Sequence, residues 1–263
     1  IETNIFWLTG EMPSVDDLQN PKLSQASEIY SADGVLLGKY FAENRTPIRD
    51  YHLLSPHLVK ALVATEDARF YEHTGIDFQA WAGVLVGMVK GGDRGGGSTI
   101  SQQLAKNLFH TRSMEFGEDD PVYIGLLMKI DGLRTVIAKV KEWILAIKLE
   151  RRYTKQEIMA MYLNEVSFGN NAYGIQVACR TYFQKDIQQV SLTEAATLIG
   201  LLQNPSLYDP RVRPEKTLER RNTVLGQLAK YDFILPEELD KLRDIMKRED
   251  KHAIAEFTAG PLY

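Results

Sequence analysis

The sequence predicts a mainly α-helical protein with a short β-hairpin near its N-terminus. Helix-capping patterns recur from residue 55 onward, and apolar residues follow them at helical spacing. The β-prone runs that flank a turn signal lie before residue 45. Hydrophobic residues make up 44% of the 263 residues and charged residues 25%, so the chain has an ordinary globular composition and enough length for a buried core.

Charge and cysteine content exclude several classes of protein. The net charge is −4, from 31 basic and 35 acidic residues, so no overall positive field recruits nucleic acid. Cys179 is the single cysteine and its flanks are typical of a packed helix, which predicts an inert core thiol and excludes a disulfide framework or a thiolate metal cage. No apolar run approaches the ~20 residues that a membrane span needs.

The N-terminal part of the chain combines a polar segment with one hairpin signal. Residues 1–28 are polar, contain two prolines and indicate a linker. Residues 28–41 hold two β-prone runs around Asp33-Gly34, which predicts a hairpin. Ser55-Pro56 then supplies an N-cap and a first-turn proline ahead of apolar residues at helical spacing, which predicts the first helix.

Local signals predict several further helices. Three capping boxes indicate helix starts at Thr99-x-x-Gln102, Thr154-x-x-Glu157 and Ser191-x-x-Glu194. The helix after the third box is predicted to stop before Asn204-Pro205, because proline disfavours a helical predecessor. Pro236 and the two acids after it predict a last helix. An apolar stripe predicts a helix through residues 136–149, and its members are Val136, Val140, Trp143, Ile144 and Ile147.

A glycine-rich stretch, residues 91–97, precedes the helix predicted at Thr99. It lacks the Gly-Lys-Ser/Thr ending of a phosphate loop and no strand signal precedes it, so a nucleotide site is not expected. Its five glycines predict a mobile lid or hinge, with an idle surface loop as the alternative. The next helix carries hydrogen-bonding groups on neighbouring turns, which suit a sugar and an anionic oxygen unless this face is merely solvated; they belong to Gln102, Gln103, Lys106 and Asn107.

An acidic pair, Glu66 and Asp67, ends the first predicted helix within ATEDARFYEHTGID. Four more stretches follow it in the order of a known family: GGGSTISQQLAKNLF, AKVKEWILAIKLE, RRYTKQEIMAMYLNEVSFGNNAYGI and LTEAATLIGLLQNPSLYDP. Together they resemble the five motif blocks of the peptidoglycan glycosyltransferases (family 51 transglycosylases), found in class A penicillin-binding proteins and monofunctional transglycosylases. The resemblance spans roughly Ser55–Asn222.

The resemblance implies a mainly α, lysozyme-like fold with a large head lobe and a smaller, membrane-facing jaw lobe. We therefore expect residues 1–45 to be a linker and β-hairpin that follow a removed membrane anchor, and residues 46–263 to be the glycosyltransferase domain, with the jaw lobe near 76–135. The apolar residues of 78–89 suit a jaw that touches the membrane, with burial inside the protein as the alternative. The implied location is the periplasmic side of the bacterial cell membrane.

The resemblance also implies a reaction, the polymerisation of glycan strands from lipid II, a disaccharide-peptide on a polyprenyl pyrophosphate. The 4-hydroxyl of the acceptor sugar attacks the anomeric carbon of the lipid-linked donor with inversion, and polyprenyl pyrophosphate leaves. A sugar hydroxyl is a weak nucleophile, so this chemistry needs a base. Glu66 matches the family's catalytic glutamate, and its place at the end of a helix beside apolar residues is expected to make it a stronger base than a free glutamate.

A second catalytic glutamate and a set of cations follow from the other motifs. Glu142 matches the second glutamate, in a block where Ala138 stands in place of the family's arginine. Lys106 matches the lysine that holds the leaving pyrophosphate. By resemblance, substrate binding is assigned to Asp67, Phe70, His73, Ser98, Thr99, Gln102, Gln103, Lys106, Asn107, Arg134 and Lys139. Of these, Asp67, Phe70 and His73 are also expected to build the bend that positions Glu66.

One departure from the family pattern leaves an arginine assignment open. Residues 113–133 are extra sequence between the second and third blocks, so the family's phosphate-binding arginine is Arg112 or Arg134. Spacing back from Glu142 favours Arg134. The arginine lost at position 138 could be offset by Arg134 or Lys141, or its loss could mean weaker activity.

Two other functions fit part of the pattern. A lysozyme-like glycan hydrolase also uses two carboxylates in a sugar cleft, but it needs no pyrophosphate cradle of the kind that Lys106 would supply. A noncatalytic glycan-binding scaffold would tolerate loss of Glu66.

The expected partners are those of the family. They are lipid II, the growing glycan strand and the membrane surface, and no nucleic acid. The Ser-x-x-Lys signature of a serine transpeptidase does not occur, so either the enzyme is monofunctional or, as we expect, a C-terminal transpeptidase domain lies beyond this chain. No cofactor is expected to be required, although a divalent cation, Mg or Mn, suits a pyrophosphate.

Overall fold

The computed structural model of the chain is mainly α-helical, as predicted. It describes residues 27–33, 36–40, 44–83, 97–109, 130 and 132–242. The predictions for the N-terminal linker, Gly34, glycines 91–96, Arg112 and most of the 113–133 segment lie outside these residues. The chain divides into two compact units: unit 1 comprises Ile1–Lys22 and Arg69–Glu165, and unit 2 comprises Leu23–Ala68 and Val166–Tyr263.

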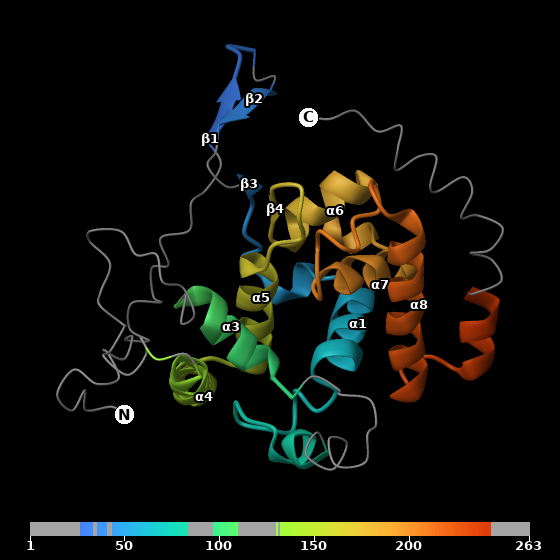
Figure 1. The fold of residues 1–263 in the computed structure, drawn as a ribbon. Coiled ribbons are helices and arrows are strands. Elements are labelled where there is room, and N and C mark those ends of the chain that lie inside the picture. Colours follow the sequence, from blue (N-terminus) through green and yellow to red (C-terminus); the bar gives the residue numbers. More distant parts are fainter. Residues whose placement is uncertain are drawn as a thin grey trace. The chain divides into compact units, whose positions relative to one another are not determined.

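Unit 2 is built on three helices that pack together (Figure 1). α1 (Pro56–Glu66) contacts α7 (Leu192–Leu201) and α8 (Pro214–Lys230), and α7 contacts α8. The last two turns of α7 are buried, because its apolar residues surround the helix rather than forming one stripe. Gly200 allows α8 to approach closely, since a Cβ there would lie 3.1 Å from Cγ of Arg220.

The helix starts predicted in unit 2 are confirmed. Ser55 caps α1 by accepting the N–H of His57, and proline occupies its first turn. Ser191 and Glu194 form a reciprocal capping box at α7: the Ser191 N–H donates to Glu194 Oε2 at 2.8 Å, and the Glu194 N–H donates to Ser191 Oγ at 3.3 Å. α7 ends at Leu201, ahead of Asn204-Pro205.

The remaining elements of unit 2 are short. β1 (Ser27–Tyr30) pairs antiparallel with β2 (Leu36–Tyr40), and β3 (Asn44–Arg45) pairs parallel with β4 (Ala172–Tyr173). The other described elements are the 3-10 helices η3 (Tyr51–Leu53) and η5 (Ile187–Gln189), helix α6 (Ile175–Phe183) and a helical segment at 236–242 that begins at the predicted proline. Cys179 on α6 is fully buried, and burial raises the pKa of its thiol to about 12, which confirms the predicted inert core thiol.

Unit 1 joins three helices around a shared core. α3 (Ile100–Leu108) packs against both α4 (Leu133–Arg152) and α5 (Lys155–Glu165). Tyr162 of α5 donates its hydroxyl hydrogen to Gln103 Oε1 of α3 at 2.9 Å. The capping box predicted at α5 is confirmed, because the N–H of Thr154 donates to Glu157 Oε2 at 2.7 Å and the N–H of Glu157 donates to Thr154 Oγ1 at 3.2 Å.

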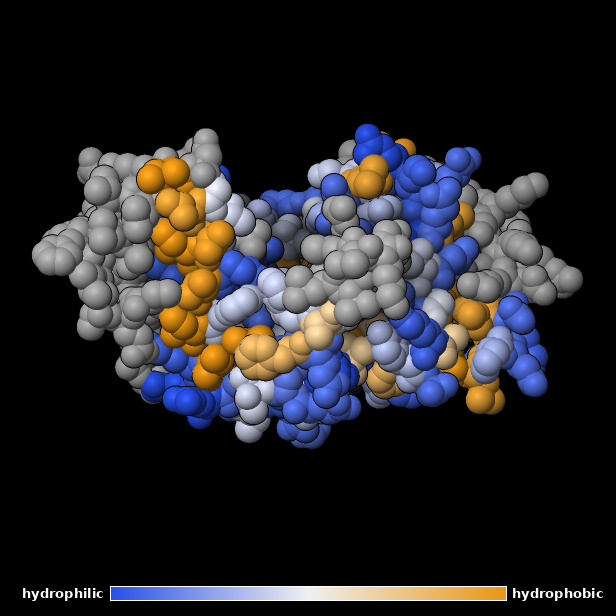
Figure 2. Space-filling view, turned by 60° about the horizontal axis from the view of Figure 1, so that its bottom comes forward, coloured by the Kyte–Doolittle hydropathy of each residue, from blue (hydrophilic) through white to orange (hydrophobic). Residues whose placement is uncertain are grey.

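The buried face of α4 differs from the stripe that the apolar pattern indicates. The helix forms where predicted, but Val136 is 59% exposed and the other members of the stripe are partly exposed. The face that packs inside unit 1 instead carries Ala138, Lys141, Glu142, Leu145, Ala146 and Leu149. Figure 2 shows an apolar strip on the surface where α4 lies. The apolar pattern found the helix but not its buried side, because that side includes two charged residues.

A short helical segment at 78–83 lies beside α4 in unit 1. Its Trp81 meets Trp143 of α4 edge to face, with ring centroids 5.3 Å apart, whereas Phe78 is 73% exposed. Trp81 is partly buried, and residues 84–89 of the predicted apolar face lie outside the described residues, so membrane contact and burial both stay predictions for this segment. Within the described part of the chain, no helix is both long enough and apolar enough to span a membrane.

Candidate active site

Glu66 is the last residue of α1, at the helix end where the sequence places it. Asp67 follows as the C-cap, and its N–H donates to the carbonyl of Val63 at 3.1 Å. Glu66 is partly buried and Asp67 is 7% exposed. The rigid packing of α1 against α7 and α8 fixes the backbone that carries both carboxylates.

Shortly after Glu66 and Asp67, the chain forms a loop at residues 69–77, which belongs to unit 1. Phe70 is fully buried, and its ring meets that of His73 edge to face. Gly75 adopts φ +102°, and a Cβ there would lie 2.9 Å from backbone atoms of Ala146 and Ile147 in α4. The motif therefore needs glycine at position 75 for two reasons, the positive φ and the close approach to a helix.

An ion pair closes this loop. Arg69 Nε donates to Asp77 Oδ2 at 3.0 Å, and a second guanidinium nitrogen donates to Oδ1. Oδ1 also accepts the N–H of Ala80 at 2.9 Å, which caps the helical segment that starts at residue 78. Burial acts to raise the pKa of Asp77, but the Ala80 N–H and the Arg69 guanidinium outweigh it and hold that pKa below its usual range.

The start of α3 holds the end of the loop. Thr99 caps α3 by accepting the N–H of Gln102, and its hydroxyl donates to the carbonyl of Gly75 at 2.7 Å. The predicted capping box is wrong in its second half, because the side chain of Gln102 turns to the loop and Nε2 donates to the Gly75 carbonyl at 3.3 Å. The Oε1 atom of Gln102 is buried with no hydrogen-bond partner in the described structure. These two predicted substrate-binding residues thus also fix the motif glycine.

Three further predicted residues meet at one ammonium group. Lys139 Nζ donates to Glu142 Oε2 at 3.0 Å and to Ser98 Oγ at 2.8 Å. The sequence predicts that Lys139 and Glu142 share a helix face, and their contact confirms this. The Glu142 side chain is 1% exposed, so its charge is desolvated and the Lys139 ammonium stabilises it.

Lys141, one of the two residues suggested as an offset for the missing arginine, lies on the buried side of α4. It is 2% exposed, and Ala138 on the same side is also buried. Burial lowers the pKa of the Lys141 ammonium from 10.5 to about 8. Arg134, the other suggestion, lies in the first turn of α4 and is partly buried.

The other predicted residues are placed on helices. Gln103 lies in the middle of α3, where Tyr162 donates to it, and Lys106 and Asn107 lie partly buried in the last turn of α3. Glu66 and Asp67 belong to unit 2 and the other described candidates to unit 1. Their assembly into one site, and their contacts with a substrate, stay predictions.

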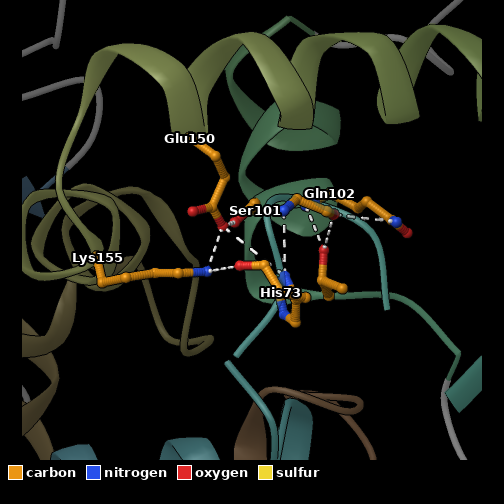
Figure 3. Close-up of polar contacts among 7 residues, drawn as sticks. His73, Ser101, Gln102, Glu150 and Lys155 are labelled. Atoms are coloured by element: carbon orange, nitrogen blue, oxygen red, sulfur yellow. Dashed lines mark hydrogen bonds and ion pairs between the residues drawn. The ribbon is translucent and has the colours of Figure 1, made fainter. Parts of the chain in front are cut away.

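Two residues that the sequence did not single out, Glu150 and Lys155, form a cluster of polar contacts in unit 1. Figure 3 shows the ammonium of Lys155 between a carboxylate oxygen of Glu150 and the backbone of His73. Ser101 donates to the same oxygen of Glu150 at 2.5 Å. A weak local signal was present, because an acid in the last turn of a helix and a lysine at the first position of the next each oppose the helix dipole.

Comparison with known proteins defines the class of this chain. The model of the transglycosylase family matches residues 33–229. That range covers most of the chain and includes every candidate site residue, so the chain belongs to the transglycosylase family. We therefore class it as a glycosyltransferase of peptidoglycan biosynthesis, related to penicillin-binding proteins.

Curated relatives share about a third of their aligned residues with the chain. Penicillin-binding protein 1A of Aquifex aeolicus is 37% identical over 256 residues, which cover 94% of this chain and 32% of the relative. Penicillin-binding protein 1A of Escherichia coli is 34% identical over 248 residues (94% and 27%), and penicillin-binding protein 1F of Bacillus subtilis is 36% identical over 217 residues (82% and 28%). The chain thus spans only about a third or less of the length of these relatives.

A solved structure also aligns with the chain. The crystal structure of penicillin-binding protein 1A from Haemophilus influenzae covers 84% of this chain and 20% of its own, at 23% identity and a TM-score of 0.44. A score at this level supports no detailed comparison of the two folds.

Proposed function

We propose that this chain polymerises peptidoglycan glycan strands from lipid II and releases polyprenyl pyrophosphate. The observation that carries the proposal is the transglycosylase family match over residues 33–229, which holds both candidate carboxylates and all the candidate cations of the described structure. The penicillin-binding proteins among its relatives, at 34% to 37% identity, agree with a role in cell-wall synthesis.

In the proposed mechanism Glu66 is the general base. Its carboxylate takes the proton of the acceptor 4-hydroxyl while the oxygen attacks the anomeric carbon of the lipid-linked donor, and the bond to pyrophosphate breaks with inversion. The position of Glu66 supports this role, because it ends a rigidly packed helix and is neither sealed in the core nor fully exposed. A base that acts on substrate needs a fixed position and a side chain that the substrate can reach.

Glu142 is proposed as the second catalytic carboxylate, acting together with Lys139. Two N–H bonds of the Lys139 ammonium point to Glu142 and Ser98, and the third can meet an oxygen of the donor pyrophosphate. Lys106 and Arg134 are proposed as further cations for the same leaving group. Preorganised cations of this kind contribute roughly a few kcal/mol each to transition-state stabilisation.

The surroundings of the reaction are proposed from the family resemblance. We propose a lysozyme-like fold with a jaw lobe near residues 76–135, on the periplasmic side of the cell membrane. The exposed apolar side chains of α4 and Phe78 support a membrane surface as partner. A membrane anchor before this chain and a transpeptidase domain after it are part of the same proposal, as is the growing glycan strand as partner.

No cofactor is proposed as a requirement. Among the described residues, no group of three or more His, Cys, Asp or Glu side chains is arranged to hold a metal ion. A divalent cation, Mg²⁺ or Mn²⁺, would bind the pyrophosphate of the substrate, and the assay below with and without EDTA tests its contribution.

The test is incubation of the chain with lipid II, followed by separation of the products by size. We expect long glycan strands and released polyprenyl pyrophosphate. Shortening of added strands without new polymer would indicate a hydrolase, and binding without any product would indicate a scaffold. Either result would overturn the proposal.

A further inference from the structure

We propose that Lys155 and Glu150 are positioning residues, which hold the loop at 69–77 in the shape that glycosyl transfer requires. The inference rests on the proposed function, because it assigns a role in that reaction. Neither residue belongs to the predicted site. Both lie where α4 ends and α5 begins, against the loop that carries Phe70, His73 and Gly75.

The ammonium of Lys155 contacts three groups, two of them on the loop. Nζ donates to the backbone carbonyl of His73 at 2.7 Å and to Glu150 Oε1 at 2.7 Å. It also lies 4.4 Å from the centre of the Phe70 ring, over its face. An ammonium has three N–H bonds, so a carbonyl, a carboxylate and an aromatic face together satisfy it.

Glu150 joins this ammonium to the helix that carries the predicted substrate-binding glutamines. Its Oε1 accepts from Ser101 Oγ at 2.5 Å as well as from Lys155. Ser101 lies beside Gln102, whose Nε2 donates to Gly75. The loop is therefore held at His73 by Lys155 and at Gly75 by α3, and Glu150 connects the two supports.

The locations of the two residues argue for a tertiary purpose. A lysine at the first position of α5 and a glutamate in the last turn of α4 each sit at the unfavourable end of a helix dipole. Their side chains are only 21% and 5% exposed. A buried ion pair is seldom more stabilising than well-packed apolar residues of the same volume, whereas it fixes geometry closely. The pair is thus better suited to positioning a loop than to stabilising unit 1.

The hydrogen bonds of His73 show how the loop depends on this pair. The N–H of Gly75 donates to His73 Nδ1 at 3.1 Å, so the ring of His73 fixes the turn that leads to the motif glycine. His73 Nδ1 also lies 4.0 Å from Glu150 Oε1, the oxygen that accepts from Lys155. Lys155 therefore holds both the backbone of His73 and the carboxylate beside its ring. Without Lys155, the His73 carbonyl and Glu150 would lose the donor that they share, and the turn to Gly75 would open.

The experiment compares four variants of the chain with the wild type. Lys155→Met removes the charge, Lys155→Arg keeps it, and Glu150→Gln keeps a carbonyl oxygen for Ser101 without the charge. Lys216→Met is the matched control, because Lys216 forms an exposed ion pair with Glu219 in unit 2. The measurements are kcat and KM for lipid II, the thermal midpoint, and the ¹⁵N signals of the His73 ring and the Gly75 amide.

We expect Lys155→Met to lower kcat by about 100-fold, the scale of a 1 Å misplacement, with KM nearly unchanged. Glu150→Gln should lower kcat less, Lys155→Arg should recover most of it, and Lys216→Met should match the wild type. The ¹⁵N signals of the His73 ring and of the Gly75 amide should both shift in Lys155→Met, because the hydrogen bond between them depends on the shape of the loop.

Distinct results would overturn the inference. If the wild type forms polymer and Lys155→Met has the same kcat, the inference is wrong. It is also wrong if the activity of Lys155→Met and Glu150→Gln falls only in proportion to the fraction of protein that is folded. If Lys155→Met does not fold, the comparison of Glu150→Gln with Lys155→Arg decides. A wild type that makes no polymer would reject the proposed function instead, and unchanged His73 and Gly75 signals in Lys155→Met would then reject the positioning role separately.

Discussion

Lys139 Nζ lies 3.0 Å from Oε2 of Glu142, three residues further along α4. The carboxylate is almost fully buried and the ammonium is partly exposed. The two side chains therefore act as one unit, in which Glu142 orients a cation that remains accessible to a substrate.

Removing either member of this pair should lower kcat/KM for lipid II nearly as much as removing both. Glu142→Gln and Lys139→Met should each lower kcat/KM for lipid II by about 100-fold, because one preorganised charge near the leaving group is lost. The kcat/KM of the double variant should lie within a small factor of that of the less active single variant, since the two residues share one role. The exposed pair Lys216 and Glu219 provides the control double variant. Effects that multiply in the double variant would contradict a shared role.

Gly75 should tolerate no side chain. Gly75→Ala combines a strained φ of +102° with a Cβ 2.9 Å from the backbone of α4, so the free energy of unfolding should fall by about 2–5 kcal/mol. Two glycines separate these effects: a Cβ at Gly132 (φ +90°) meets nothing within 4 Å, and neither does one at Gly83 in the helical segment. Gly132→Ala should show the strain alone, and Gly83→Ala should be neutral or stabilising. Denaturant unfolding of the three variants measures this, and equal losses at all three would contradict it.

Lys141 should make stability depend on alkaline pH. Its folded-state pKa is about 8 and its ordinary value 10.5, so between these pH values the unfolded chain binds a proton that the folded chain does not. Stability from this group therefore rises with pH across that window, by about 3 kcal/mol in total at 1.36 kcal/mol per pKa unit. Urea unfolding at pH 7, 8, 9 and 10 should show this rise in the wild type relative to Lys141→Met. A constant difference between the two proteins would contradict the burial of a charged ammonium.

Asp77 should contribute stability that is lost in acid. Its folded-state pKa is lowered, so the contribution is complete above its unfolded value and disappears as the pH falls through the folded one. Asp77→Asn removes an N-cap carboxylate and the partner of Arg69, and should cost about 1–3 kcal/mol at neutral pH. The cost should shrink as the pH falls below the ordinary aspartate pKa of about 3.9 and then through the lower pKa of the folded state. Unfolding of both proteins from pH 6 down to pH 2.5 tests this, and a cost that stays constant in acid would refute it.

The helix starts were predictable from sequence because they depend on adjacent residues. Ser55, Thr154 and Ser191 cap the helices that their side chains indicate, since a cap needs only a hydroxyl and the next turn of backbone. Lys139 and Glu142 were predictable as neighbours for the same reason, because helical spacing brings residues three apart together.

What sequence could not predict depends on contacts between distant segments. The Gln102 side chain does not complete the expected capping box and donates instead to the Gly75 carbonyl, 27 residues away. The buried side of α4 includes Lys141 and Glu142, which a hydrophobic pattern assigns to solvent. Lys155 and His73 are 82 residues apart, and no local rule joins them.

The central claim is that Glu66 is the base of the transfer. The most direct measurement is the rate of polymer formation from lipid II by Glu66→Gln, beside Glu72→Gln, an exposed glutamate in the following loop, as the matched control. The amide has nearly the same shape but cannot accept the proton, so we expect Glu66→Gln to form essentially no glycan strands while Glu72→Gln matches the wild type. Polymer formation by Glu66→Gln at the wild-type rate would contradict the account.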